Sequence, residues 1–166
     1  MQDDAYVTYS GSGHSYFLGD SPQLLLDLNL ASDFTDSQNN DDDIQLDFFP
    51  GLSAPGDRPE IAIWSLGSNP LESRILTEGQ IAVQNLNTAN NRLALQNYPV
   101  YYFLEAAVPW SALHIVPQPG LHLGLAASVS DNDTAGTNVQ ECMLSTSPNR
   151  DWQNPTTWGT LILAVE

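Results

Sequence analysis

Alternation of apolar and polar residues is the clearest pattern in the chain. Leucine recurs at every second position from Leu24 to Leu30, and most of the positions between are polar. Ile44, Leu46 and Phe48 repeat the pattern. A period of two predicts strands with one buried face and one partly exposed face. The polar stretch from Ala31 to Asp43 is predicted to be a loop, so the two strands form a hairpin with a long acidic tip.

Further segments have the length and composition of strands, and turn residues such as Pro-Gly and Asn-Pro pairs separate them. They are Glu60 to Trp64, Ile81 to Leu86, Arg92 to Gln96, Val100 to Val108, His122 to Ser130, Glu141 to Ser145 and Thr160 to Val165. Helical periodicity is weak, and only Pro109 to Leu113 favours one short helical turn. About nine short strands predict an all-β fold, a single antiparallel β-sandwich of jelly-roll or immunoglobulin-like type over residues 1–166.

The charge balance limits the partners. The chain has 20 acidic residues, four arginines and no lysine, and its formal net charge is −16. Nucleic acid and anionic membranes would be repelled, because the cations that neutralise phosphates are missing. No apolar run approaches the roughly 18 residues of a membrane span. Neutral glycans, divalent cations and cationic surfaces remain, beside the simpler interpretation that acidity keeps a secreted protein soluble.

The candidate catalytic groups do not form a recognisable set. Cys142 stands alone in an apolar run, and we expect it to be a small buried residue. Glu105 has no obvious carboxylate partner in the sequence, as a glycosidase needs. The three histidines lack the close spacing of zinc motifs, and no nucleophile elbow or phosphate-binding loop occurs. We therefore expect no enzymatic activity.

Several segments have a distinctive composition. They are the strand from Gly19 to Asp27, the segment Leu104-Glu-Ala-Ala-Val-Pro-Trp110, the step from Pro119 to Asp133, and the Trp-x-x-Pro-x-x-Trp-Gly pattern from Trp152 to Gly159. Together they resemble the family 9 carbohydrate-binding modules, which are β-sandwiches in a wider group that includes the DOMON domains. The resemblance implies non-catalytic binding of a neutral polysaccharide or oligosaccharide by a domain attached to an enzyme or a surface protein.

Sugar recognition needs a flat aromatic face and planar polar groups for hydroxyls. Trp152 has polar neighbours on both sides, which is the composition of an exposed loop. In the family two tryptophans enclose a terminal sugar, and the resemblance implies that Trp152 is one and that Asn149 makes a polar contact. Trp64 is the candidate for the second, with an ordinary sheet residue as the alternative. Further candidates for hydroxyl contacts are Arg150, Gln153 and Glu60. Trp110 and Trp158 are predicted to fill the core.

Acidic clusters supply the hard oxygen ligands that calcium takes. The candidate ligands are Asp131, Asn132 and Asp133 in one turn, and Asp33, Asp36 and the run Asp41-Asp-Asp43 in the acidic loop. No EF-hand spacing is present. Family members carry structural calcium, so the resemblance implies a bound calcium ion. The alternative for the first group is a solvated turn built on side-chain hydrogen bonds.

The first residues lack the cationic and apolar segments of a signal peptide. Family members begin with an additional leading strand, so we expect a sandwich whose N-terminal edge is either trimmed or finished differently, and which can form an oligomer through that edge. The resemblance implies an extracellular or cell-surface location. The alternative function is a structural or adhesive sandwich of a larger extracellular protein that does not bind sugar.

Overall fold

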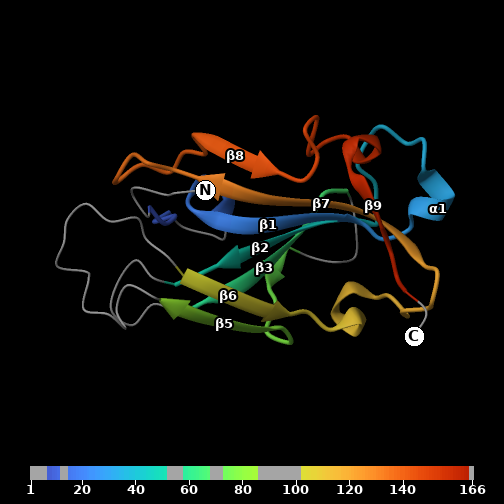
Figure 1. Ribbon diagram of the computed structural model, residues 1–166, viewed down its shortest axis with the longest axis horizontal. Helices are drawn as coiled ribbons and strands as arrows, with labels where there is room; N and C mark the ends of the chain where they lie inside the picture. The colour runs from blue at the N-terminus through green and yellow to red at the C-terminus, as the bar shows by residue number, and fades with distance from the viewer. Residues whose placement is uncertain (1–6, 12–14, 52–57, 68–72, 86–101, 165–166) are drawn as a thin grey trace.

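The computed structural model describes residues 7–11, 15–51, 58–67, 73–85 and 102–164. Nine strands lie within these ranges (Figure 1). They are β1 (Ser21–Asp27), β2 (Asp43–Phe49), β3 (Glu60–Ser65), β4 (Arg74–Ile75), β5 (Gln80–Asn85), β6 (Tyr102–Ala107), β7 (His122–Asp131), β8 (Cys142–Ser145) and β9 (Gly159–Ile162). The helical turns are η1 (Tyr16–Leu18), α1 (Leu30–Asp33), η3 (Trp110–Leu113) and η4 (Pro155–Thr157).

Two antiparallel sheets face each other (Figure 1). The larger sheet has the strand order β4-β3-β2-β1-β7-β8, and β9 also pairs with β7. The first part of β7 pairs with β9 and its second part with β8, while β1 runs along its other edge. In the described part of the second sheet, β5 pairs with β6. The predicted all-β sandwich is therefore confirmed, as is the hairpin of β1 and β2.

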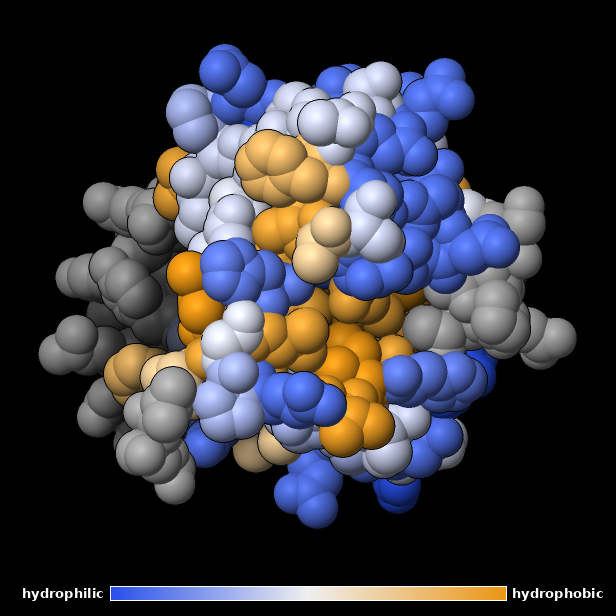
Figure 2. Space-filling model, turned by 90° about the vertical axis from the view of Figure 1, so that its right-hand side faces the viewer, coloured by the Kyte–Doolittle hydropathy of each residue, from blue (hydrophilic) through white to orange (hydrophobic). Residues whose placement is uncertain are grey.

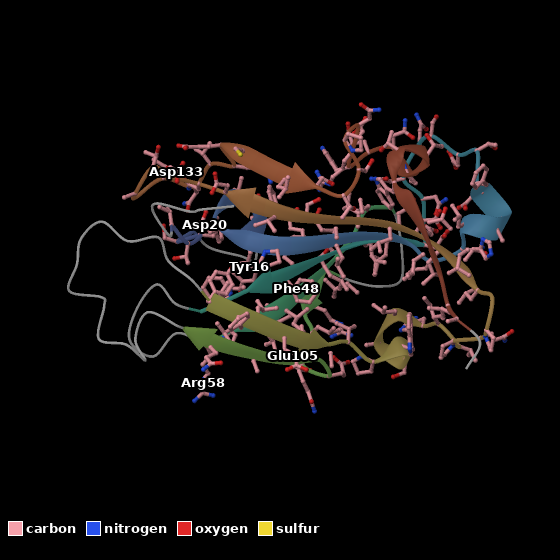
Figure 3. All side chains as sticks on the ribbon, viewed as in Figure 1. Tyr16, Asp20, Phe48, Arg58, Glu105 and Asp133 are labelled. Atoms are coloured by element: carbon pink, nitrogen blue, oxygen red, sulfur yellow. The ribbon has the colours of Figure 1, made fainter. Side chains whose placement is uncertain are left out.

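The main core lies between the two sheets. Its buried residues in the large sheet are Leu26, Ile44, Leu46, Phe48, Ile61 and Ile63, and Figure 3 shows Phe48 between the layers. The second sheet contributes Ile81 and Leu104, and Trp110 of η3 packs against the same cluster. A smaller cluster on the opposite face of the large sheet contains Leu25, Ala126 and Trp158. The predicted core positions of Trp110 and Trp158 are therefore confirmed.

The polar positions of β1 and β2 correct the sequence-based prediction. The alternation indicated a partly exposed face, but Gln23, Asp27 and Asp47 are no more than 2% exposed. The reason is that the chain after β7 folds back over this face, where Trp158 packs against Leu25. Both faces of these strands are thus covered. Buried polar side chains need hydrogen-bond partners. The polar side chains that gather on this second face can therefore form a binding site.

Other predictions also differ from the structure. Leu30–Asp33 forms the helical turn α1, which begins at the last residue of the predicted strand and continues into the segment predicted to be a loop, and buried Leu30 anchors it. Cys142 is exposed rather than buried, because it lies on the outward side of the edge strand β8. The short strand β4 has no counterpart in the predictions. The predicted strand from Arg92 to Gln96 lies outside the described residues. No helix in the described ranges is long and apolar enough to cross a membrane.

Candidate binding site

A pocket of about 330 Å³ opens on the covered face of the large sheet. Three adjacent strands line it, with Gln23 on β1, Gln45 on β2 and Trp64 on β3. The strand register explains their proximity, because Gln45 pairs directly with Trp64. Other walls come from Phe17, Leu66, Gln140, Arg150 and Trp152. The volume is at the lower end of the range for small-molecule sites.

Trp64 and Trp152 therefore line the same pocket, although they are far apart in the sequence. Trp64 is partly buried near the end of β3, and its Nε1 donates a 3.0 Å hydrogen bond to Asp47 Oδ2. Trp152 lies in the loop between β8 and η4 and is 49% exposed. Two indole rings at one pocket offer apolar surface to the C–H face of a sugar ring.

Hydrogen bonds hold the loop that carries Trp152. Asn39 Nδ2 donates to the Trp152 carbonyl over 3.0 Å, which ties this loop to the segment before β2. The Nε1 of buried Trp158 donates to the Asp151 carbonyl over 2.9 Å. The Asp151 carboxylate in turn accepts from the Gln153 backbone N–H over 2.9 Å. A loop held in this way loses little conformational entropy when a ligand binds.

Arg150 supplies polar groups at the pocket wall. Its Nη2 lies 3.4 Å from Gln23 Oε1, to which it donates. Within the described ranges, Arg150 Nε and Gln23 Nε2 are buried and have no hydrogen-bond partner. Burial lowers the pKa of Arg150, and the negative charges of Asp47 and Asp151 oppose this change. Hydroxyl oxygens of a ligand are suitable acceptors for these donors.

Asp47 lies beneath the pocket and holds two of its lining residues in position by hydrogen bonds. It is 0% exposed, and its two carboxylate oxygens accept from Gln45 Nε2 over 2.8 Å and from Trp64 Nε1 over 3.0 Å. Burial raises the pKa of Asp47 to about 7, although both hydrogen bonds act in the opposite direction. Asp47 thus orients the Trp64 ring and the Gln45 amide.

The raised pKa of Asp47 predicts a pH dependence of stability. The folded state holds this proton more tightly than the unfolded chain, so the free energy of unfolding falls as pH rises from about 4 through about 7. In the unmodified protein this decrease in the free energy of unfolding is on the order of 2–4 kcal/mol, and we expect Asp47→Asn to abolish it. The Gln45 amide would turn so that its oxygen accepts a hydrogen bond from the side-chain amide that the substitution introduces. Urea denaturation of both proteins at pH 4 and pH 8 in saturating calcium measures this. Equal pH slopes for the two proteins would contradict the assignment.

The remaining sugar-binding candidates lie elsewhere. Glu60, at the start of β3, accepts a 2.5 Å hydrogen bond from the Tyr16 hydroxyl and does not line the pocket. Asn149 is exposed and is not among the lining residues. Gln153 lines a neighbouring hollow instead. Sequence reasoning missed Gln23 and Gln45, for which the signal was a polar residue within an otherwise apolar strand.

A cluster of carboxylates lies where the acidic loop meets the sheet. Asp27, Asp33 and Asp42 each place an oxygen within 4.8 Å of the others. In the described part of the chain, Asp33 Oδ1, Asp42 Oδ2 and Asp43 Oδ1 are buried without a hydrogen-bond partner. Burial, with the neighbouring charges, raises the pKa of Asp27 to about 6 and that of Asp43 to about 7. Unpartnered carboxylate oxygens at this spacing fit a calcium ion.

The predicted metal ligands fall into two places. Asp33 and Asp42 belong to the cluster and Asp43 adjoins it, whereas Asp27 was missed. Asp36 is exposed and accepts from the Gln38 backbone N–H over 3.1 Å. The turn of Asp131, Asn132 and Asp133 is separate, and Figure 3 shows Asp133 at the end of the molecule opposite α1.

The side-chain amide of Asn132 in that turn is buried, and protein hydrogen bonds satisfy it. Asn132 Nδ2 donates to the carbonyls of Leu18 and Thr137 over 3.3 and 3.1 Å. Asn132 Oδ1 accepts from the Thr134 backbone N–H over 3.0 Å. These bonds are those of a turn built on a side-chain amide. The fit to calcium is therefore better at the cluster of Asp27, Asp33 and Asp42.

The fold and the pocket together define a β-sandwich binding module. The sequence matches the family described as carbohydrate family 9 binding domain-like over residues 66–165, and the chain belongs to this family of non-catalytic modules. No curated protein matches it.

Two solved structures of a carbohydrate binding module family 9 from Caldicellulosiruptor kristjanssonii share the fold. The one in complex with cellotriose has a TM-score of 0.62 and 16% identity, and the match covers 99% of this chain and 66% of that chain. The one in complex with glucose has a TM-score of 0.54 and 14% identity, with 99% and 68% covered. The chain thus spans slightly less than two thirds of the first of these proteins.

Proposed function

We propose that this protein binds a neutral sugar between Trp64 and Trp152 and does not act on it chemically. The observation that carries the proposal is that one small pocket, on a member of this family, is lined by both indole rings together with donors of Arg150 and Gln23 that have no partner among the described residues. The rings supply apolar stacking surface, and the donors meet hydroxyl oxygens. The solved family 9 modules in complex with cellotriose and glucose support the same ligand class.

The pocket chemistry supports binding rather than catalysis. None of the described residues that line it is an aspartate or a glutamate, so these residues do not supply the two carboxylates of a glycosidase mechanism. Asp47, beneath the pocket, already accepts hydrogen bonds on both oxygens. The net charge of −16 favours neutral glycans over acidic ones.

We infer that the module acts as an accessory domain of an extracellular or cell-surface protein. A module that binds polysaccharide raises the local concentration of an attached enzyme or surface domain on it, and this requires no chemistry of its own. The acidic, lysine-free composition suits a secreted protein. Oligomer formation through a sheet edge stays a prediction, which the molecular mass in solution tests.

We also propose that Asp27, Asp33 and Asp42 hold a structural calcium ion. The ion would offset the repulsion among these carboxylates, of which Asp33 Oδ1 and Asp42 Oδ2 are buried and have no hydrogen-bond partner among the described residues. The same segment leads to the binding site, because Asn40 Nδ2 donates to Asp33 Oδ2 over 2.5 Å and the adjacent Asn39 donates to the Trp152 carbonyl. Calcium would thereby stabilise the loop that holds Trp152.

Titration of tryptophan fluorescence with cello- and xylo-oligosaccharides tests the proposed function. We expect a saturable change in emission, together with retention of the protein on insoluble cellulose or xylan. A structural or adhesive sandwich would give a flat titration and no retention. Release of reducing sugars from a panel of polysaccharides would show that the protein is an enzyme instead.

A further inference from the structure

Two glutamine side chains on adjacent strands line the pocket, and a charged residue holds each of them. Gln45 Nε2 donates to Asp47 Oδ1 over 2.8 Å, and Gln23 Oε1 accepts from Arg150 Nη2 over 3.4 Å. The strand register places these side chains on one face of the sheet, because Gln23 pairs directly with Asp47 and Gln45 lies two residues before Asp47. The carboxylate thus holds the nitrogen of one amide, and the guanidinium holds the oxygen of the other.

The two amides consequently present opposite groups to a ligand. Gln45 keeps Oε1, which is an acceptor, and Gln23 keeps Nε2, a buried donor without a hydrogen-bond partner among the described residues. Arg150 Nε is a second donor of this kind. A sugar hydroxyl accepts through its oxygen and donates its hydrogen. A hydroxyl that accepts from Gln23 or Arg150 therefore needs an acceptor, and Gln45, which pairs with Trp64, can supply it.

The ionisation of Asp47 decides which atom Gln45 presents. Trp64 Nε1 can only donate, so Asp47 Oδ2 must stay an acceptor whether or not the carboxyl is protonated. A proton on the carboxyl therefore resides on Oδ1, which faces Gln45. The Gln45 amide must then turn so that Oε1 accepts from this O–H, and Nε2 takes the place of Oε1 at the pocket. Protonation of Asp47 thus replaces an acceptor at the pocket with a donor.

We propose that Asp47 is a positioning residue for sugar binding, whose ionised form holds Gln45 with its acceptor toward the ligand. The inference deepens the proposed function and rests on it. The ionised form presents one acceptor together with the donors of Gln23 and Arg150, which matches a hydroxyl that both donates and accepts. The protonated form presents donors from all three side chains, so the ligand loses a hydrogen bond. Sugar affinity accordingly rises with pH as Asp47 ionises.

Charged and titratable groups around Asp47 set the pH range of this change. Burial raises the pKa of Asp47 to about 7, and its two hydrogen bonds and the positive charge of Arg150 oppose this. Arg150 also interacts with Asp151, and it stays protonated. Tyr16 of η1 interacts with Asp47 as well, and burial together with its hydrogen bond to Glu60 raises the pKa of Tyr16 further above neutrality. Of Asp47, Arg150 and Tyr16, Asp47 is therefore the group whose ionisation changes near pH 7.

Two carboxylates outside the pocket lose their protons in a similar pH range. Burial raises the pKa of Asp27 to about 6 and that of Asp43 to about 7. Asp27 lies shortly before α1 and pairs with Asp43, and Figure 2 looks onto the α1 end of the molecule, where hydrophilic residues dominate the upper part. Measurements in saturating calcium that compare the unmodified protein with Asp47→Asn separate their contribution from that of Asp47.

Calorimetric titration with the best cello- or xylo-oligosaccharide at pH 5.5 and pH 8.5 tests the inference. For the unmodified protein we expect affinity to be roughly 3- to 10-fold higher at pH 8.5, which corresponds to one neutral hydrogen bond. Asp47→Asn is expected to bind at both pH values with the affinity that the unmodified protein has at pH 5.5. The reason is that its amide donates to Gln45 Oε1 and accepts from Trp64 Nε1, as the protonated carboxyl does. A variant with a damaged site would instead bind more weakly than the unmodified protein at pH 5.5 as well.

The Nε1–H signal of Trp64 provides a second measurement, on the unmodified protein. This signal should follow the ionisation of Asp47 in NMR spectra, because the two groups share a hydrogen bond. We expect its pH midpoint to move to lower pH in saturating sugar, since a ligand that prefers the ionised carboxyl stabilises that form. Asp36→Asn is the matched control, because Asp36 is exposed and does not line the pocket. It should keep the pH dependence of affinity.

The outcomes separate this inference from the proposed function. If the sugar binds equally well at both pH values, or if Asp47→Asn keeps the pH dependence of the unmodified protein, the positioning role is wrong and the proposed function stands. A Trp64 midpoint that saturating sugar does not move would also contradict the positioning role. If no sugar binds at either pH, the proposed function and the positioning role both fail.

Discussion

Replacement of Trp152 with alanine is expected to weaken oligosaccharide binding by a factor of about 30 or more. Aromatic residues that anchor a ligand in a pocket commonly contribute about 2 kcal/mol or more, and each 1.4 kcal/mol is about a factor of ten. The indole is 49% exposed, so its loss should change the melting temperature little. Calorimetric titration with the best cello- or xylo-oligosaccharide measures the change.

Phe103→Ala provides the control for this experiment. Phe103 is 65% exposed on β6, in the sheet whose described residues do not line the pocket. The control loses an exposed aromatic side chain of comparable type and should bind as the unmodified protein does. If Trp152→Ala bound the oligosaccharide with unchanged affinity, the site would not lie at this loop.

Removal of calcium is expected to lower the melting temperature by about 5–10 °C. An ion present at 100 times its dissociation constant stabilises the folded state by about 2.7 kcal/mol, and each 1 kcal/mol corresponds to about 2–4 °C in a chain of this size. Differential scanning calorimetry in calcium and in a chelator measures the shift. Sugar affinity should fall together with stability, because Asn39 links the acidic segment to the Trp152 loop. The same melting temperature in calcium and in chelator would contradict the calcium proposal.

Asparagine substitutions locate the calcium site. Asp42→Asn should abolish the calcium-dependent shift, because it removes a carboxylate from the cluster. In chelator the variant should be at least as stable as the unmodified protein, because burial and the charge of Asp33 disfavour ionisation of Asp42 and raise its pKa. Asp36→Asn, outside the cluster, should keep the shift. A shift that survives Asp42→Asn but not Asp133→Asn would assign the ion to the other turn.

Short-range patterns were sufficient to predict the fold. The alternation around Leu24 and Ile44 identified β1 and β2, because strands repeat every two residues whatever covers them. It did not predict that Gln23 and Asp47 are buried, since this depends on the chain after β7 folding back over the sheet. Turn α1 was missed because Leu30–Asp33 is too short to show helical periodicity.

The candidate site was predictable in part. Trp152 could be selected because its polar neighbours indicated an exposed loop, and it is indeed about half exposed. Trp64 remained ambiguous, because its place in the pocket depends on the pairing of β2 with β3 and on the loop that carries Arg150. The acidic loop predicted Asp33, whereas Asp27 joins the cluster only through the hairpin register, in which it pairs with Asp43.

The most direct measurement is the NMR response of the four tryptophan indole N–H groups to an oligosaccharide that binds. The account predicts that the Nε1–H signals of Trp64 and Trp152 shift together with one dissociation constant. The signal of Trp110, which packs against the core between the sheets, should stay in place. A titration in which Trp64 and Trp152 do not move, while the sugar binds, would show that the two rings do not form the site.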